Sequence, residues 1–276
     1  MPEGPEIKTI VDSLNLVLPG LSLNKIIVNE KSRYFKNLKN KNILDSSKLP
    51  LCIRMIICKG KHIFFKFESS LNSNEVIIMH SHLAMTGKWI WDKGKHSGIE
   101  LFLSNQKVLY FDDTRRFGCV EWFNQEQYKK KLKNIGIDIL SEHITLKHWN
   151  KIMSNTRLKK KQICDMLISQ KYISGIGNYL KSEILYLSKI RPDRELQSLT
   201  DVELEMLYTT SLKTIKASYN SGGLTIQDYI DPDGNTGKFK VIIYGKKGKK
   251  DPNGYSIITS TFKDRRTTFW VKEIQK

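Results

Sequence analysis

The hydrophobic periodicity of this chain changes near residue 124, and that change limits the folds open to it. Before it, short runs rich in β-branched and aromatic residues alternate with Gly, Asn and Asp, which predicts antiparallel strands in a sandwich or barrel. From residue 145 onward, apolar residues recur at helical spacing. We therefore expect an α+β protein. The expected strands are 21–28, 51–58, 62–67, 76–79, 99–103, 108–111 and 119–123.

Two terminal segments frame these regions. Residues 3–18 carry apolar side chains at helical spacing and end at Pro19-Gly20, which predicts an amphipathic N-terminal helix. Beyond Gly222 the pattern is β-like again, with strands expected at 240–244, 255–262 and 267–271. The expected division is an N-terminal helix and β-sandwich domain at 1–124, a linker or exposed helix within 125–144, a helical domain at 145–238 and a terminal hairpin at 239–276.

The helical region has recognisable start signals. A helix over 159–170 is expected to lead through the turn Ser174-Gly175-Ile176-Gly177 into a second helix beginning near Asn178. A third helix is expected to begin with a capping box formed by Thr200 and Glu203, with a hydrophobic staple between Leu199 and Leu204.

Charge and cysteine usage restrict the partners and the compartment. The 276 residues carry a net charge of +18, spread along the chain, so a nucleic acid is the expected partner ahead of an anionic membrane. No apolar run is long enough to span a bilayer, and the N-terminus does not resemble a signal peptide. The four cysteines form no C-x-x-C pair. They predict buried reduced thiols, no metal site and a reducing intracellular location, nucleus or cytoplasm. A monomer is expected.

The first six residues, Met1-Pro2-Glu3-Gly4-Pro5-Glu6, suggest covalent chemistry. Removal of the initiator Met, favoured by a small second residue, exposes the secondary amine of Pro2. An α-amino group has a pKa of about 8, against about 10.4 for a lysine, so it is nucleophilic near neutral pH. Glu3 and Glu6 lie within one helical turn, and an amine beside acids suits iminium formation. The alternative is an ordinary helix start, where Pro and Glu are both common.

Three further motifs follow. Lys59-Gly60-Lys61-His62 enters a strand, and His82-Leu83-Ala84-Met85-Thr86-Gly87 precedes the run 112–118, Asp-Asp-Thr-Arg-Arg-Phe-Gly. The run 174–183, Ser-Gly-Ile-Gly-Asn-Tyr-Leu-Lys-Ser-Glu, precedes Arg265-Arg266-Thr267-Thr268-Phe269. Taken in this order with the N-terminus, the motifs resemble the formamidopyrimidine-DNA glycosylase / endonuclease VIII (Fpg/Nei) family of DNA repair enzymes from end to end.

The resemblance implies a bifunctional DNA glycosylase and AP lyase of base excision repair. Pro2 would attack C1′ of the damaged nucleotide, and Glu3 would act as general acid and base. Glu6 and Glu183 would orient water, sugar or protonated groups, and Lys61 would contact phosphate near the lesion. The strand would then be cut by β,δ-elimination, with no metal and no organic cofactor. The partner would be damaged double-stranded DNA, with single-stranded or bubble DNA as further substrates.

The resemblance also implies DNA-binding roles. A glycosylase must flip its target nucleotide out of the duplex, and Met85, Arg115 and Phe117 would fill the resulting hole. Asn178 and Arg266 would bind phosphate, as would free N–H groups at the start of the helix near Asn178. Ordinary alternatives exist for each residue: a core methionine for Met85, and solvated surface side chains for the charged groups. Arg265 competes with Arg266 for its role.

The terminal hairpin departs from the zinc-binding pattern of bacterial relatives. The four cysteine positions correspond to Asp251, Gly254, Val271 and Ile274, which cannot form a thiolate site. This resembles the zincless finger of the endonuclease VIII-like branch, including a mimivirus relative. That resemblance favours oxidised pyrimidines as substrates, with 8-oxoguanine and formamidopyrimidine lesions as the alternative. Tyr229, in the expected pocket loop 222–238, could face the base.

Two other classes of protein fit the charge. One is an architectural DNA-binding protein that uses the same basic surface and wedge residues without chemistry. The other is an RNA-binding or ribosome-associated protein.

Overall fold

The computed structural model describes residues 1–29, 34, 48–69, 76–224, 232 and 234–276. The chain divides into two compact units, and each is described by itself. The first comprises residues 1–2, 6–134 and 225–237, and the second comprises residues 3–5, 135–224 and 238–276.

The first unit is built from helix α1 (Gly4–Val17) and an eight-stranded antiparallel array. Its strand order is β5-β7-β6-β1-β2-β3-β4-β8. The strands are β1 (Ser22–Val28), β2 (Leu51–Lys59), β3 (His62–Ser69), β4 (Val76–His82), β5 (Gly87–Ile90), β6 (Ser97–Leu103), β7 (Val108–Asp113) and β8 (Cys119–Phe123).

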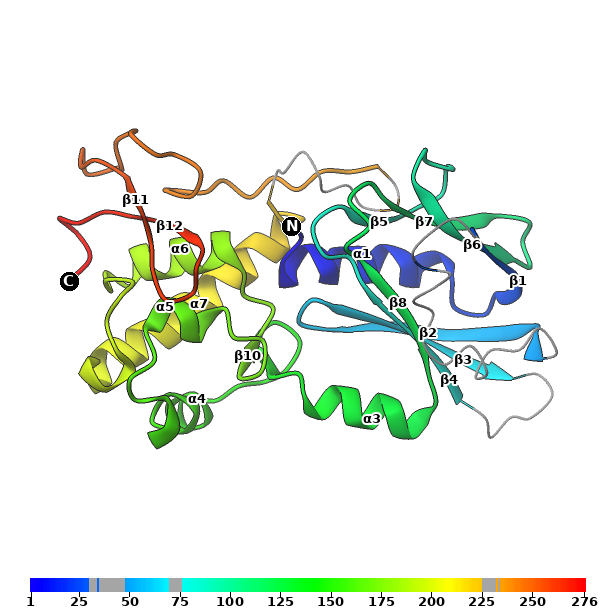
Figure 1. Ribbon diagram of the computed structural model, residues 1–276, viewed down its shortest axis with the longest axis horizontal. Helices are drawn as coiled ribbons and strands as arrows, with labels where there is room; N and C mark the ends of the chain where they lie inside the picture. Colours follow the sequence, from blue (N-terminus) through cyan, green and yellow to red (C-terminus); the bar gives the residue numbers. More distant parts are fainter. Residues whose placement is uncertain (30–33, 35–47, 70–75, 225–231, 233) are drawn as a thin grey trace. The chain divides into compact units, whose positions relative to one another are not determined.

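The array is a sandwich because its two halves are joined only at one corner. β1 pairs with β2 through Ser22 and Leu23 alone, whereas it pairs with β6 from Leu23 to Val28, with a register shift between Leu23 and Lys25. One hydrophobic core contains side chains from both halves and the buried face of α1, including Leu14, Phe65 and Trp89. Figure 1 shows α1, in blue, alongside the strands of its unit. The expected N-terminal helix and antiparallel sandwich are confirmed.

One strand of this unit was not specified by the sequence, and the segment after residue 124 adopts the helical one of its two expected forms. β5 has only four residues and begins at Gly87, too short to produce a visible period. Residues Gln125–Lys133 form helix α3, which begins with a capping box between Asn124 and Gln127. Its buried Tyr128 packs edge-on against Phe64 of β3, at 5.2 Å between ring centroids. The first part of the expected linker is therefore a helix packed on the sheet, and the four-part domain division stays a prediction.

The second unit is mainly helical and ends in a two-stranded hairpin. Its helices are α4 (Leu146–Met153), α5 (Ile163–Leu167), α6 (Asn178–Leu187) and α7 (Asp201–Asn220), with 3-10 turns at Thr156–Leu158 and Leu196–Ser198. Two short parallel strands, β9 (Ile137–Asp138) and β10 (Ile173–Ser174), pair with each other. The hairpin consists of β11 (Ile258–Thr261) and β12 (Thr267–Trp270).

The prediction of a helix over 159–170 was wrong in length. The carbonyls of Lys159 and Lys161 accept hydrogen bonds from Gln197 and Leu196, at 3.0 Å each, and Ile163 N donates to Arg194 O at 2.8 Å. These pairings replace the bonds that a helix would need there, so only Ile163–Leu167 is helical.

The prediction of a strand at 240–244 was also wrong. The backbone N–H groups of Ile242, Ile243 and Tyr244 donate to the Glu183 carboxylate and not to a neighbouring strand. A carboxylate can gather several N–H groups only from a turn, because successive N–H groups of a strand point to opposite sides.

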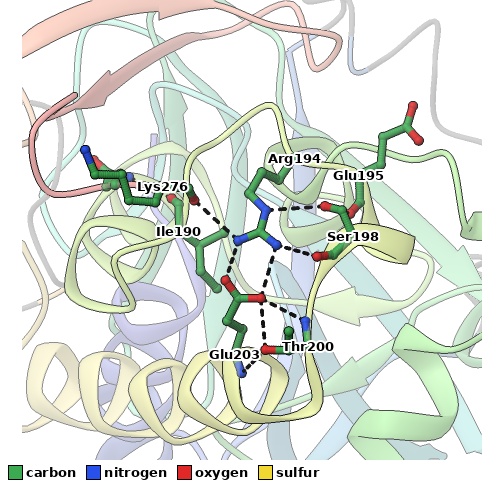
Figure 2. Close-up of polar contacts among 8 residues, drawn as sticks. Ile190, Arg194, Glu195, Ser198, Thr200, Glu203 and Lys276 are labelled. Atoms are coloured by element: carbon green, nitrogen blue, oxygen red, sulfur yellow. Dashed lines mark hydrogen bonds and ion pairs between the residues drawn. The ribbon is translucent and has the colours of Figure 1, made fainter.

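Helix α7 begins as the sequence predicts, at a capping box of Thr200 and Glu203. Figure 2 shows how Arg194 extends this cap. Its guanidinium bonds both Glu203 oxygens, the Ser198 carbonyl, the Ser198 hydroxyl at 3.3 Å and the Lys276 carbonyl at 3.4 Å. One side chain thus connects the start of α7 with the preceding turn and the last residue of the chain. Within the described part of the chain, no helix is long and apolar enough to cross a membrane.

Candidate active site and DNA-binding residues

Glu3 is held at the start of helix α6. Its carboxylate accepts hydrogen bonds from Gly177 N at 2.6 Å, Tyr179 N at 3.0 Å and Leu180 N at 3.3 Å, and the residue is 3% exposed. These N–H groups were expected to receive a phosphate. That expectation needs correction, because the three named groups already bind a carboxylate of the chain itself. An acid at the N-terminus of a helix is favoured by the helix dipole.

Two glycines let the N-terminal segment approach α6 this closely. Gly4 N donates to Gly175 O at 2.8 Å, and a Cβ on Gly4 would lie 3.0 Å from the Gly175 Cα. Gly175 itself has φ of +97°, which favours glycine. Gly4 and Gly175, one from each sequence motif, are therefore explained by one contact, which fixes the residue after Glu3.

The remaining expected catalytic residues of the first unit are buried. Pro2 is buried, and Glu6 on α1 is 0% exposed. Lys61 is 6% exposed and lies in the tight turn between β2 and β3, where Gly60 has φ of +57°. Burying a lysine or a glutamate costs free energy unless its charged group has partners. Ordinary surface lysines and glutamates are rarely buried in this way.

Met85, Arg115 and Phe117 are brought together from two loops. The Arg115 Nη1 lies 3.3 Å from the Met85 Sδ, and its guanidinium stacks over the Phe117 ring with 5.6 Å between Cζ and centroid. Met85 is 39% exposed and Phe117 is 54% exposed. A core location for Met85 is therefore wrong. The three side chains form one exposed apolar and cationic group suited to entering a base stack.

Asp113, at the end of β7, holds both loops in place. Its carboxylate accepts from the Thr86 hydroxyl at 2.6 Å, Gly118 N at 2.7 Å and the Tyr34 hydroxyl at 2.6 Å. Thr86 in turn accepts from Arg115 N at 3.0 Å. The sequence analysis missed this organising role, although Asp113 lies inside the motif and directly precedes the exposed loop.

Asn178 and Arg266 lie in the second unit. The Asn178 Nδ2 donates to the Thr267 carbonyl at 2.9 Å, and the Asn178 side chain also hydrogen-bonds Tyr244. Arg266 is exposed, and its backbone N donates to Asp264 Oδ1 at 3.2 Å. Arg265 is also exposed, with φ of +56°.

A buried ion pair supports this hairpin. Lys181 on α6 pairs with Asp264, both side chains being 0% exposed, and the Lys181 ammonium also donates to the Thr268 hydroxyl at 2.8 Å. Burial lowers the pKa of Lys181, and the hydrogen bond to Asp264 opposes that shift. The sequence singled out neither residue, since a lysine on a helix is usually solvated.

Glu183 has a backbone role inside the second unit. Its oxygens accept from Ile242 N at 2.7 Å, Ile243 N at 3.0 Å and Tyr244 N at 2.8 Å. Burial raises the pKa of this carboxyl group, and the three N–H donors oppose the increase. The side chain thus fixes the turn at 242–244, which is a positioning role and differs from the expected orientation of water or sugar.

A second buried polar cluster was not anticipated. His80 on β4 lies between Glu121 on β8, at 3.1 Å from its Nδ1, and His62 on β3, at 2.8 Å from its Nε2. Burial lowers the pKa of His62 to about 2 and that of the neighbouring His82 to about 4. The hydrogen bond from His80 lowers the pKa of Glu121 to about 2.

The four hairpin positions expected to replace zinc ligands do not fit a zinc ion. Asp251 accepts from the Tyr186 hydroxyl at 2.9 Å and from Tyr255 N at 2.7 Å, and Val271 is an apolar core residue at 0% exposure. Gly254 and Ile274 carry no ligand atom. Tyr229 and part of the loop 222–238 lie outside the described residues.

Comparison with known proteins is consistent with this arrangement. Residues 1–120 match the formamidopyrimidine-DNA glycosylase N-terminal domain, and residues 135–229 match the formamidopyrimidine-DNA glycosylase H2TH domain. A formamidopyrimidine-DNA glycosylase of Wolbachia pipientis is 31% identical over the full length of both chains. One of Rickettsia bellii is 28% identical, again over the full length of both.

Solved structures show the same fold. The MutM (Fpg) protein of Thermus thermophilus matches with a TM-score of 0.85 at 24% identity, over 99% of this chain and 98% of that chain. Lactococcus lactis Fpg in complex with DNA containing N7-benzyl-Fapy-dG matches with a TM-score of 0.85 at 24% identity, over all of both chains. Together with the site geometry, these full-length matches show that the chain belongs to the formamidopyrimidine-DNA glycosylase (Fpg/Nei) family of DNA glycosylase/AP lyases.

Proposed function

We propose that Pro2, freed by removal of Met1, is the nucleophile of this glycosylase/AP lyase and that Glu3 is its acid/base partner. The observation that carries the proposal is the anchoring of Glu3 by three N–H groups at the start of α6. A residue held this firmly fixes the adjacent amine, and fixed geometry is what a covalent mechanism requires.

The chemistry follows from the amine. The Pro2 nitrogen bonds to C1′ and gives up its N–H proton, which leaves with the base as the bond from C1′ to the base breaks. Glu3, in its protonated form, then donates a proton to the sugar ring oxygen as the ring opens. The resulting iminium acidifies the C2′ hydrogen, so loss of that proton expels the 3′ phosphate. A second elimination expels the 5′ phosphate. General acid/base catalysis of this kind contributes about 10² to 10⁴ in rate.

We further propose damaged double-stranded DNA as the substrate, with Met85, Arg115 and Phe117 entering the stack. Lys61, Asn178 and Arg266 would bind backbone phosphate. The contacts of Arg115 with both Met85 and Phe117, and the exposure of Met85 and Phe117, support this assignment. Glu6 and Glu183 act from buried positions and would orient the site.

The lesion preference we propose is that of the named relatives, formamidopyrimidine and 8-oxoguanine lesions. The full-length curated relatives are formamidopyrimidine-DNA glycosylases, which supports this alternative over the expected oxidised pyrimidines. A Lactococcus lactis Fpg structure contains an oxidised pyrimidine, so both classes belong in the test. The hairpin without zinc ligands remains a point of resemblance to endonuclease VIII-like enzymes.

Borohydride trapping tests the mechanism and the preference together. The purified protein is reacted in competition on duplexes bearing formamidopyrimidine, 8-oxoguanine, 5,6-dihydrouracil or an abasic site. We expect an adduct that maps to Pro2, faster on the purine lesions, and none with Pro2→Gly. Glu3→Gln should slow base release by about 10² to 10⁴. If protein that lacks Met1 binds the duplexes tightly but forms no adduct on any of them, the result would instead support the architectural DNA-binding alternative.

A further inference from the structure

The register of β4 and β8 gathers metal-ligating side chains on one face of the first unit. His80 pairs with Glu121 and His82 pairs with Cys119 across the two strands, and alternate residues of a strand share a face. Ligand atoms of His80, Cys119 and Glu121 all lie within 4.8 Å of one another. His80 is 1% exposed and Glu121 is 8% exposed, so these groups are held in place by packing.

The separation of the donor atoms matches that of two ligand atoms bound to the same tetrahedrally coordinated ion. Zinc binds nitrogen and oxygen ligands at about 2.0–2.1 Å, which places two such ligands about 3.3 Å apart. The His80 Nδ1 and the Glu121 Oε2 are 3.1 Å apart. The two groups are therefore already spaced as neighbouring ligands, and Cys119 lies on the same face within reach of both.

His62 supplies the support that metal-binding histidines usually have. Its Nδ1 lies 2.8 Å from the Nε2 of His80, the ring nitrogen that does not face Glu121. A second hydrogen bond of this kind fixes the tautomer and the orientation of a ligating imidazole. The arrangement runs from carboxylate to imidazole to imidazole across three strands.

We propose that His80 Nδ1, the Glu121 carboxylate and the Cys119 thiolate bind a divalent transition metal of the zinc type. A neutral imidazole with two anionic ligands balances the charge of the ion, as a buried site requires. Imidazole and thiolate donors favour zinc or cobalt over magnesium or calcium, which prefer oxygen ligands.

Proton balance accompanies binding. The Cys119 thiol proton leaves to solvent. The His80 proton moves from Nδ1 to Nε2, from which it is donated to the Nδ1 of His62, and His62 then carries its own proton on Nε2. Lys131, whose ammonium is 3.9 Å from Glu121 Oε2, is 32% exposed and can turn toward solvent as the ion takes its place. The site therefore departs from the expectation that none of the four cysteines binds metal. The sequence did not indicate it, because His80 is about 40 residues from Cys119 and Glu121 and the three meet only through strand pairing.

Cobalt(II) titration of the full-length protein tests the proposal directly. After dialysis against a chelator, one equivalent of Co²⁺ should produce tetrahedral d–d absorption in the visible and a thiolate-to-cobalt charge-transfer band in the near ultraviolet. Zn²⁺ should displace both signals and raise the melting temperature, because an ion that binds only the folded state stabilises it.

Variants separate this site from adventitious binding. Cys119→Ser should abolish the charge-transfer band, Glu121→Gln should weaken binding, and His62→Phe should lower affinity by about 10- to 100-fold. Cys52→Ser is the matched control, a partly buried strand cysteine outside the cluster that should leave the spectrum unchanged. Absence of cobalt binding by the wild-type protein, or a charge-transfer band that persists in Cys119→Ser, overturns the proposal. If Cys119→Ser does not fold, the Glu121→Gln variant provides the test. A cobalt affinity of Glu121→Gln equal to that of the wild-type protein would also overturn the proposal.

Discussion

Asp113 illustrates how a single residue decides the shape of a site. Its carboxylate joins the Thr86 hydroxyl, Gly118 N and the Tyr34 hydroxyl, and so fixes the loops that carry Met85 and Phe117. The sequence predicted the exposed residues of both loops, because flexible, cationic and aromatic side chains suit the chemistry. It did not predict their organiser, because a buried aspartate is recognisable only from the N–H and O–H groups around it.

Partly buried histidines make stability depend on pH at the residue scale. The pKa of His82 falls from 6.5 to about 4 because burial disfavours the charged form, and that of His62 falls to about 2. Between pH 6.5 and these values the unfolded chain binds more protons than the folded chain, so stability is complete above pH 6.5 and is lost as pH falls.

We therefore expect the free energy of unfolding of the wild-type protein to drop between pH 7 and pH 5, by roughly 1–2 kcal/mol for His82 alone. Urea unfolding at a series of pH values measures this. His82→Gln should flatten the slope, and His148→Gln, an exposed histidine, should not change it. A slope equal in wild type and His82→Gln would show that His82 is not the titrating group.

At the scale of elements, helix α6 connects most of the functional residues of the second unit. Its start binds Glu3, Lys181 binds the hairpin turn, and Glu183 binds the turn at 242–244. The sequence predicted where this helix begins. It also predicted the α7 capping box, since those signals are local. It failed at 159–170 and 240–244, where backbone groups bond to partners distant in the chain.

The Lys181–Asp264 pair offers a test of how the hairpin is held. Lys181→Met leaves a buried carboxylate without its cation and should cost about 3–5 kcal/mol, whereas Lys181→Met with Asp264→Leu should recover much of that loss. Chemical denaturation of both single variants and the double variant measures the coupling. Additive effects in this cycle would mean that the two side chains do not interact in solution.

The Arg194 side chain also connects separate elements, because it bonds both the α7 cap and the Lys276 carbonyl. Thr200→Ala should cost about 1 kcal/mol through loss of the cap. Arg194→Ala should cost a similar amount and also loosen the C-terminal residues, which amide hydrogen exchange near Lys276 would detect. Arg191→Ala, which removes a more exposed arginine paired with Asp193, is the control and should leave exchange there unchanged.

At the scale of the whole molecule, the net charge of +18 predicts strongly salt-dependent DNA binding. Each phosphate contact contributes about 0.9 to the slope of log affinity against log salt. Arg266→Gln should reduce that slope by about 1 and weaken lesion-bearing and undamaged duplexes alike. Met85→Ala should leave the slope unchanged. Fluorescence anisotropy at several salt concentrations distinguishes the two variants. An unaltered slope for Arg266→Gln would show that Arg266 does not contact phosphate.

The anchoring of Glu3 also has a consequence for biosynthesis. Residues 177–180, which supply its three N–H donors, are translated long after Glu3 has left the ribosome. The segment around Glu3 therefore waits for a later part of the chain before it reaches its final position. A nascent chain interrupted before residue 180 would lack N–H groups that hold Glu3, so this contact is delayed until most of the polypeptide exists.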